Sequence, residues 1–218
     1  MEDVLDVYER PYDAKTPVVC VDETCKEIHA DVREPIAARP ATDEKPGAPA
    51  REDFEYLRHG SASIFMIYEP LTGRCHAESS EHRTREDYAR IVRYICDNMF
   101  PDAEKIVLVQ DNLNTHTIGS LYHTFEPEEA RRLARRLEIH YTPKHGSWLN
   151  MAEIALRLLC NQCLARRFPS REELARQVNA WTERNRQSPM KTDWRFTTAD
   201  ARIKLKRLYP ILEAPSTT

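Results

Sequence analysis

The sequence predicts an α/β fold in which a mixed sheet is flanked by helices, with additional helices at the C-terminal end. Two short apolar runs, VVCV from Val18 and IVLV from Ile106, have the composition of strands that are buried on both faces. Segments whose apolar residues recur at helical spacing separate and follow these runs. With 218 residues, the chain is long enough to bury a sizeable core.

The segments after the first apolar run predict a long loop and a hairpin. CKEIHAD, from Cys25, either extends the first strand or pairs with it. Residues 33–53 combine prolines with many charges, which predicts a long irregular loop, and loops of this length are usually functional or mobile. SASIFMIYEP and RCHAES then flank LTG, a pattern that fits a β-hairpin.

Helical periodicity predicts most of the remaining elements. Thr84 and Asp87 resemble a capping box, and the helix after them has one apolar face: Tyr88, Ile91, Val92, Ile95 and Met99. A second helix, arginine-rich on its other side, is marked by Ala130, Leu133, Ala134 and Leu137. EIHYTP predicts a short strand, and further helices begin near Asn150, Ser170 and Thr198. The last two make a helical region over residues 170–210, and residues 211–218 form a tail.

Composition is that of an ordinary globular protein, with 41% hydrophobic and 31% charged residues. No apolar stretch approaches the roughly 18 residues that span a membrane, and the acidic N-terminus does not resemble a signal peptide. We therefore expect no membrane partner, and a cytoplasmic protein with reduced cysteines. Cys160 and Cys163 have a C-x-x-C spacing, but no second pair is evident, so we interpret them as core thiols rather than zinc ligands.

The net charge of -3 conceals an asymmetry along the chain. Residues 1–153 carry 19 basic and 29 acidic side chains, whereas residues 154–218 carry 13 basic and 6 acidic ones. A basic C-terminal third can bind a polyanion such as DNA, although a solvated helical face explains the charge equally well.

Each of the two buried runs leads into an aspartate, Asp22 or Asp111. Catalytic groups collect at the carboxyl ends of parallel strands, so the two carboxylates are expected side by side. Two ionised carboxylates side by side repel each other unless a cation lies between them. Mg²⁺ and Mn²⁺, which prefer oxygen ligands, are suitable cations. Aspartate is also frequent after strands without any metal. Glu23 neighbours Asp22, but strand alternation points it to the opposite face.

Glu153 supplies a third carboxylate, in the first turn of the helix that begins near Asn150. A third acid makes an all-oxygen metal site a stronger hypothesis. A structural interpretation stays open, because Asn150 and Glu153 also have the spacing of an N-cap and its reciprocal acid.

Six motifs follow one another along the chain: VCVDE, YLRHGSASIF, LTG, VQDNLNTH, TPKHGSWLNMAE and DARIKLKRLYP. In order and context they resemble the DDE transposases, most closely the mariner-related branch of bacterial insertion sequences. The resemblance extends from about Val4 to about Pro210. It implies a ribonuclease-H-like catalytic domain over residues 17–210, with Asp22, Asp111 and Glu153 as the DDE triad. It also implies two Mg²⁺ or Mn²⁺ ions, cleavage of DNA at transposon ends and strand transfer to target DNA.

Within this hypothesis, Asp22 is the expected bridging ligand of both ions, with Asp111 and Glu153 on one ion each. Asn112 and His116 are expected to orient the phosphate or a metal ligand, unless His116 merely fastens the following loop.

Three further side chains are expected to support the site. His145 and Trp148 precede Glu153 and shape the approach to it, although Trp148 fits core packing as well as stacking on DNA. Arg58 opens the hairpin strand and either faces the site or makes a structural ion pair.

Two features depart from the family pattern. Forty-one residues separate Asp111 from Glu153, more than is usual, and the arginine-rich helix around residues 127–137 accounts for the excess. The family's helix-turn-helix half is missing ahead of residues 1–16, which resemble the linker that follows it. We therefore expect a catalytic fragment or the product of a split or truncated gene.

The predicted partners are transposon and target DNA, a separate helix-turn-helix chain and a second copy of the chain as a homodimer, in a nucleoid-associated bacterial protein. The alternative is an inactive or domesticated transposase remnant that binds DNA or a partner chain.

Overall fold

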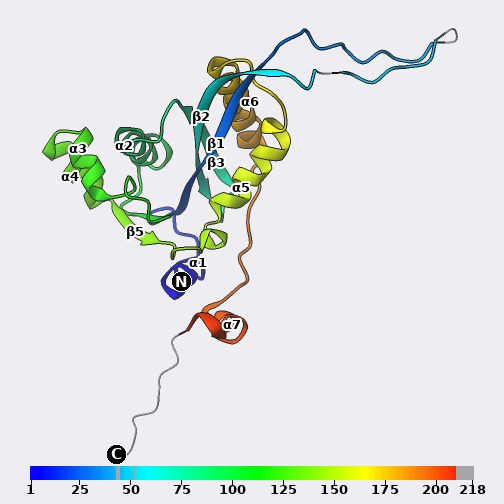
Figure 1. The fold of residues 1–218 in the computed structure, drawn as a ribbon. Coiled ribbons are helices and arrows are strands. Elements are labelled where there is room, and N and C mark those ends of the chain that lie inside the picture. The colour runs from blue at the N-terminus through cyan, green and yellow to red at the C-terminus, as the bar shows by residue number, and fades with distance from the viewer. Residues whose placement is uncertain (43–44, 52, 210–218) are drawn as a thin grey trace, which may run out of the picture.

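The computed structural model describes residues 1–42, 45–51 and 53–209. At its centre lies a five-stranded mixed sheet with helices on both faces (Figure 1). The strands lie in the order β3-β2-β1-β4-β5 and comprise β1 (Val18–Asp31), β2 (Tyr56–Glu69), β3 (Arg74–Ser80), β4 (Ile106–Gln110) and β5 (Leu137–Tyr141). The β1–β2 and β2–β3 pairs are antiparallel, whereas β1–β4 and β4–β5 are parallel. The predicted α/β fold with a mixed sheet is confirmed.

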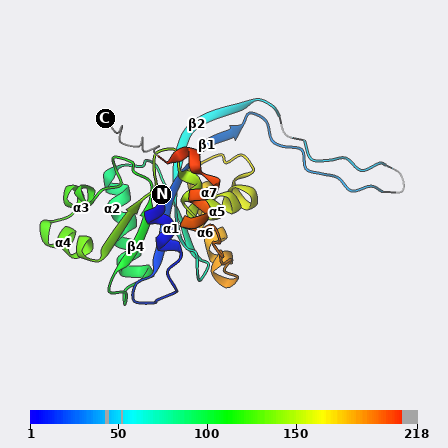
Figure 2. The same ribbon diagram turned by 90° about the horizontal axis from the view of Figure 1, so that it is seen from below.

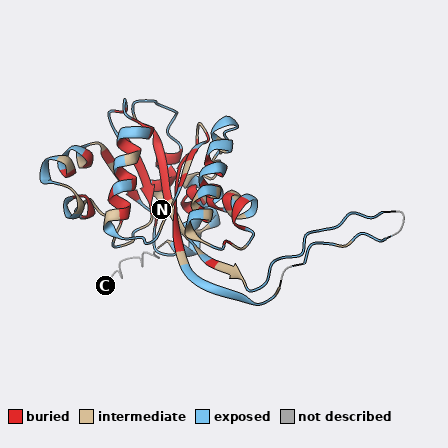
Figure 3. Cartoon of the chain, turned by 90° about the horizontal axis from the view of Figure 1, so that it is seen from above, coloured by how far each residue is buried: buried red, intermediate tan, exposed pale blue. Residues whose placement is uncertain are grey.

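The two apolar runs form neighbouring central strands. The first four residues of β1 and all of β4 are buried (Figure 3). One face of the sheet packs against α2 (Arg85–Tyr94), α3 (Ile118–Thr124) and α4 (Pro127–Arg135). The other face packs against α1 (Glu2–Tyr8), α5 (Ala152–Leu159), α6 (Arg171–Gln187) and α7 (Thr198–Lys204), and Figure 2 shows the sheet between the two layers. Because both faces are covered, the central strands are continuously apolar rather than alternating.

Side-chain caps fix where the predicted helices begin. The Thr84 hydroxyl accepts a hydrogen bond from the Asp87 N–H, and the Asp87 carboxylate accepts one from the Thr84 N–H, which completes the predicted capping box. Ser170 caps α6, and Thr197 caps α7. Helix α3 has no side-chain cap, and the sequence did not predict it. Short π-helical and 3₁₀ turns complete the chain: Ile95–Met99, Ser147–Leu149, Cys160–Leu164 and Lys206–Leu208.

The arginine-rich helix ends earlier than predicted, because α4 stops at Arg135 and Leu137 already opens β5. Arg136, between them, donates hydrogen bonds to four carbonyl oxygens at the end of the α2 layer: those of Cys96, Phe100, Pro101 and Ala103. A cation is favourable there, since carbonyl groups at a helix end lack helical partners. Arg132 binds Asp97 and Glu129, so these two arginines are engaged within the fold.

Residues 1–16, expected to be linker-like, contain a helix that is part of the core. Val4, Leu5 and Val7 of α1 are fully buried. The Tyr8 hydroxyl donates a hydrogen bond of 2.6 Å to the carbonyl oxygen of Leu149. These apolar residues pack in the same core cluster as α5 and α6, on the same face of the sheet. The segment is therefore bound to the domain rather than extended away from it.

Residues 32–42, 45–51 and 53–55 belong to a projecting two-stranded arm instead of the predicted irregular loop (Figure 1). CKEIHAD extends β1 into the base of this arm, where Asp31 pairs with Tyr56 of β2. Beyond the base, three pairs of residues exchange backbone hydrogen bonds: Ile36 with Arg51, Arg39 with Ala48 and Thr42 with Lys45. Because only every third residue is paired, the prolines occupy unpaired positions, where the lack of an N–H costs no hydrogen bond. This spacing also produces no alternation of apolar and polar residues, which is the sequence signal of a strand.

The predicted LTG hairpin joins β2 to β3 and depends on Gly73. Its φ of 77° lies in the left-handed region, and a Cβ atom there would lie 2.5 Å from the backbone carbon of Met190. Only glycine satisfies both conditions. At the other end of the chain, Pro210 and the predicted tail over residues 211–218 lie outside the described residues. Among the helices of the described ranges, none is both long and apolar enough to cross a membrane.

Candidate active site

Asp22 and Asp111 lie at one edge of the sheet. The parallel register of β1 and β4 ends two residues before each aspartate, so the two strands deliver them at the same level. Burial raises the pKa of Asp22 to about 7, although a hydrogen bond from the Glu23 N–H acts in the opposite direction. The negative charges of Glu153, Glu23 and Asp111 raise this pKa further. Four carboxylates thus influence one another here, a situation that a bound cation relieves.

Asn150 connects the start of α5, which carries Glu153, to β1. Its side-chain amide donates hydrogen bonds to the Val21 carbonyl oxygen at 2.8 Å and to the Asp22 carboxylate at 3.3 Å. Its side-chain oxygen accepts one from the Ala152 N–H at 3.1 Å. The Glu153 carboxylate is exposed and makes no reciprocal bond to Asn150, so the capping-box interpretation is wrong. Asn150 instead fixes the first turn of α5 beside Asp22.

His116 is buried between Asp111 and Glu23. Its Nδ1 atom lies 2.5 Å from Asp111 Oδ1, and its Nε2 atom lies 3.4 Å from Glu23 Oε2. Burial raises the pKa of Asp111, but the hydrogen bond and charge of His116 outweigh it and leave that pKa below its usual value. The Glu23 side chain is 5% exposed, its Oε2 atom has no hydrogen-bond partner within the described residues, and burial raises its pKa.

The residue types fit a divalent cation with oxygen ligands, because the negative charges of three other carboxylates act on Asp22 and carboxylates are preferred by Mg²⁺ and Mn²⁺. The oxygens of the predicted triad are not all within 4.8 Å of one another. In the described part of the chain, the group that meets this distance is Glu23, Asp111 and His116. Its imidazole turns one nitrogen to each carboxylate, so the ring contacts both acids. Glu153, being exposed, has to turn inward to share an ion with Asp22.

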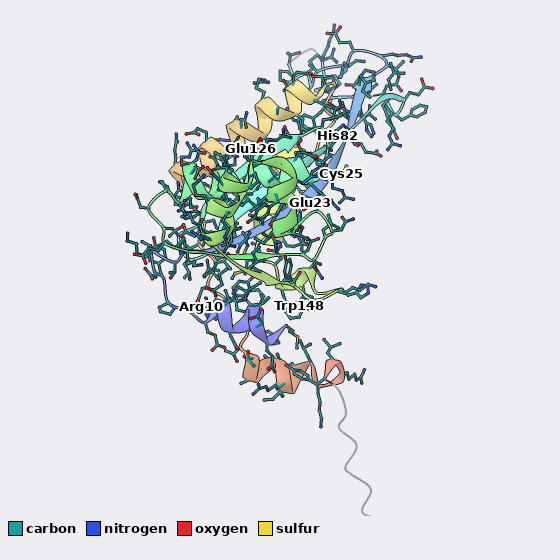
Figure 4. The ribbon with its side chains drawn as sticks, turned by 90° about the vertical axis from the view of Figure 1, so that its left-hand side faces the viewer. Arg10, Glu23, Cys25, His82, Glu126 and Trp148 are labelled. Carbon is teal, nitrogen blue, oxygen red and sulfur yellow. The ribbon has the colours of Figure 1, made fainter. Side chains whose placement is uncertain are left out.

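The remaining predicted residues near the triad lie at the surface. Asn112 is exposed in the loop after β4. His145 is exposed, with a φ of 66°, in the turn that leads to Glu153. Trp148 is 45% exposed and is not a core residue; Phe196 contacts its ring edge to face, with centroids 5.8 Å apart (Figure 4).

Arg58 is not brought to this site. In the β1–β2 ladder, Met66 lies opposite Asp22, whereas Arg58 lies opposite His29. Arg58 and Met66 are eight residues apart in β2, which places them roughly 26 Å apart along the strand at about 3.3 Å per residue. The Arg58 guanidinium pairs with Glu27 at the base of the arm, so the structural interpretation of this arginine is the correct one.

A surface groove runs along the start of α5 beside Glu153. Trp148 and Ile154, both partly exposed, line it together with Arg157. The groove therefore offers an aromatic ring and a guanidinium next to the carboxylates.

Two residues, Asn150 and Glu23, were assigned no role in the site from the sequence alone. Asn150 was considered only as a helix cap, and Glu23 was set aside because of its strand face. The position of Glu23 did hold a signal, since an acid that follows a buried strand into the protein interior requires a polar partner.

The model of the family described as DDE superfamily endonuclease matches residues 17–175. A solved structure titled "Crystal structure of the Mos1 Strand Transfer Complex" matches with a TM-score of 0.53 and 15% identity, over 83% of this chain and 50% of that one. The chain thus spans about half the length of that structure, and the likeness confirms the predicted ribonuclease-H-like fold. No curated protein matches the sequence. By its family match over most of its length, the chain belongs to the DDE superfamily endonucleases.

Proposed function

We propose that the chain is the catalytic part of a DNA transposase of an insertion sequence, which cleaves DNA at transposon ends and transfers the strands to a target. The observation that carries the proposal is the placement of three acids around one edge of the sheet, near enough for the charges of Glu153 and Asp111 to raise the pKa of Asp22. Asp22 and Asp111 follow adjacent parallel strands, and Asn150 holds the turn of Glu153 against Asp22. Membership of an endonuclease family and the fold shared with the Mos1 strand transfer complex support it.

The proposed metal ligands are Asp22, Asp111 and Glu153, with two Mg²⁺ or Mn²⁺ ions. When bound, such ions supply Lewis acidity and a more acidic attacking water for an in-line displacement at phosphorus. Asp22 is the proposed ligand of both, because it is the acid on which the charges of the others converge. Asp111 is held by His116 through one oxygen, and the other oxygen is free to bind.

The groove beside Glu153 is the proposed path of the DNA strand. Trp148 presents an exposed ring of the kind on which nucleobases stack, and Arg157 offers a cation for a phosphate. His145 and Asn112, both exposed near the acids, are proposed to contact the DNA backbone.

Metal-dependent strand cleavage tests this function. Wild-type protein is expected to nick supercoiled plasmid DNA in Mg²⁺ or Mn²⁺ but not in EDTA. Glu153→Gln should reduce nicking to background, because an amide is a poor ligand for a divalent cation, while an exposed side chain contributes little to stability. Agarose-gel conversion of supercoiled to open-circular plasmid measures both. Equal nicking by the variant, or nicking in EDTA, would count against the proposal.

We further propose that sequence reading belongs to a separate helix-turn-helix part or chain, and that the chain acts as a homodimer in the bacterial nucleoid. Arg132 and Arg136 are engaged by acids and carbonyl groups of the fold, so they are not available to read bases. The excess of basic residues after residue 153 suits phosphates, which carry no direct sequence information.

DNA binding by this chain is therefore expected to be weak, insensitive to sequence and sensitive to salt. Dissociation constants of about 10⁻⁴ to 10⁻⁶ M are typical of such binding. A competition assay at two salt concentrations, between the element's terminal repeats and scrambled DNA of equal length, measures it. A hundredfold preference for the repeats would show that the chain reads sequence itself.

A further inference from the structure

The side chain of Glu23 is buried, ionisable and unused by the proposed catalytic triad. It is 5% exposed, and its nearest charged neighbours are His116, at 3.4 Å, and the mostly exposed Arg83, at 3.7 Å. Burying an acid in this way is unfavourable unless the carboxylate has a polar partner. The ring of His116 is the buried group that offers one.

The His116 ring is fixed from three directions. Tyr88 stacks on it, with ring centroids 4.7 Å apart and an angle of 28°. The His116 carbonyl oxygen accepts hydrogen bonds from the Gln110 amide at 2.8 Å and the Tyr141 hydroxyl at 3.1 Å. The Tyr88 hydroxyl in turn donates to Gln110 at 2.8 Å. The two hydrogen bonds fix the His116 backbone, and the stacked Tyr88 ring fixes the plane of the imidazole. Rotation of the ring within that plane is left to its contacts with the two acids.

The two ring nitrogens have different partners. Nδ1 donates to Asp111 Oδ1 at 2.5 Å, and Nε2 faces Glu23 Oε2 at 3.4 Å. The ligand atoms that group Glu23, Asp111 and His116 are one ring nitrogen and one oxygen of each acid, within 4.8 Å of one another. The same ring contacts both carboxylates, one through each nitrogen, and so connects Glu23 to Asp111. Its Nδ1 end binds Oδ1 of Asp111, and within the described residues no hydrogen bond reaches Oδ2.

We propose that Glu23 is a positioning residue, which acts through His116 to orient the Asp111 carboxylate for metal binding. The inference rests on the proposed function of the triad. It gives the consecutive acids of β1 separate tasks: Asp22 binds the metal, and Glu23 sets the geometry of the other strand's ligand. Groups that orient metal ligands in this way typically change metal affinity by about 10- to 100-fold when removed.

Mn²⁺ titration of the metal-free protein, followed by the electron paramagnetic resonance signal of free Mn²⁺, tests this. Glu23→Ala should weaken Mn²⁺ binding about 10- to 100-fold without changing the number of ions bound. Glu23→Gln keeps a polar side chain of the same length opposite Nε2 and should stay within about threefold of the wild type. The matched control is Glu27→Ala, an acid on the same strand that pairs with Arg58 and His29 outside the site, and it should bind as the wild type does.

A double-mutant cycle separates positioning from a general effect on folding. His116→Asn retains an N–H directed at Asp111 but is too short to reach Glu23. In that background, Glu23→Ala should cause no further loss, because its effect is transmitted by the ring. The NMR signal of the His116 Nδ1 proton gives a readout independent of metal. It should be downfield and slow to exchange in the wild type and in Glu23→Gln, and lost or shifted in Glu23→Ala.

Several results would overturn the inference. Wild-type affinity in Glu23→Ala would leave Glu23 without a positioning role. Equal loss in Glu23→Gln and Glu23→Ala, with one ion fewer bound, would make Glu23 a metal ligand instead. If Glu23→Ala does not fold, Glu23→Leu, which removes the polar group but fills its space, replaces it in the cycle, and an additive effect with His116→Asn on affinity would contradict the proposed coupling. Failure of the wild-type protein to bind Mn²⁺ would refute the metal site of the proposed function itself, a different outcome from indifference of the variants.

Discussion

Replacing Asp22 with asparagine is expected to abolish both metal-induced stabilisation and DNA cleavage. A ligand that binds only the native state stabilises it by mass action, by about 2.7 kcal/mol at about 100 times its Kd. Wild-type protein should therefore show a clear rise in Tm with Mg²⁺ or Mn²⁺, whereas Asp22→Asn should show almost none. Differential scanning fluorimetry and plasmid nicking measure the two effects.

The same substitution should stabilise the metal-free protein at neutral pH. The folded protein raises the pKa of Asp22 from 3.8 to about 7, so the folded state binds a proton more tightly than the unfolded chain does. The stability that this proton provides is present below about pH 4 and is lost as the pH rises through about 7. One unit corresponds to about 1.4 kcal/mol, so the gain in Asp22→Asn above pH 7 is on the order of a few kcal/mol.

Glu183→Gln is the matched control, since Glu183 is an exposed acid of α6 that pairs with Arg186. It should keep the metal response, the nicking activity and the pH dependence of the wild type. Retention of the full metal-induced shift by Asp22→Asn would remove Asp22 from the metal site.

Tyr8→Ala is expected to cause a large loss of stability. The ring is 8% exposed and lies 5.2 Å, centroid to centroid, from that of Trp194. Truncation of a large buried aromatic side chain costs roughly 3–5 kcal/mol. Urea denaturation followed by circular dichroism measures this loss. A cost below about 1 kcal/mol would mean that α1 contributes little to the core and that the linker description was adequate.

Tyr8→Phe isolates the hydroxyl group. The ring stays, but the carbonyl oxygen of Leu149 loses its buried donor, which costs about 1–3 kcal/mol. Leu149 immediately precedes Asn150, so this variant should also reduce nicking at temperatures well below its Tm. Unchanged activity with reduced stability would show that Tyr8 supports the core without tuning the turn of Glu153.

The central sheet could be predicted because its signals are local. An apolar run without alternation has few alternatives to a doubly covered strand, and the pair of Thr84 and Asp87 has a specific role at a helix start. The elements that escaped prediction lack such signals. Helix α1 is one short stretch in which acids and apolar residues are mixed, and α3 begins without a side-chain cap. The paired residues of the arm recur at every third position, a spacing typical of neither a strand nor a helix.

The sequence was enough to predict which acids lie near the site, but not most of the contacts that hold them. Strand ends and a helix start account for Asp22, Asp111 and Glu153, but their roles as metal ligands remain predictions. The contact between Glu23 and His116 joins residues that are far apart in the chain, and it depends on the register of β1 against β4. Arg58 was misjudged for a related reason, because the length of β2 decides how far a residue near its start lies from Asp22.

The reach of the arm is independent of the way its base is held. Its base is held by the pair of Asp31 and Tyr56, and its hydrogen bonds recur at every third residue on each side. Losing or gaining three residues on both sides therefore changes the reach of the arm without altering how β1 meets β2. The entropic cost is small, about 0.6 kcal/mol for each doubling of a loop. Relatives of this chain can thus diversify in the length of the arm while the acids on the sheet keep their geometry.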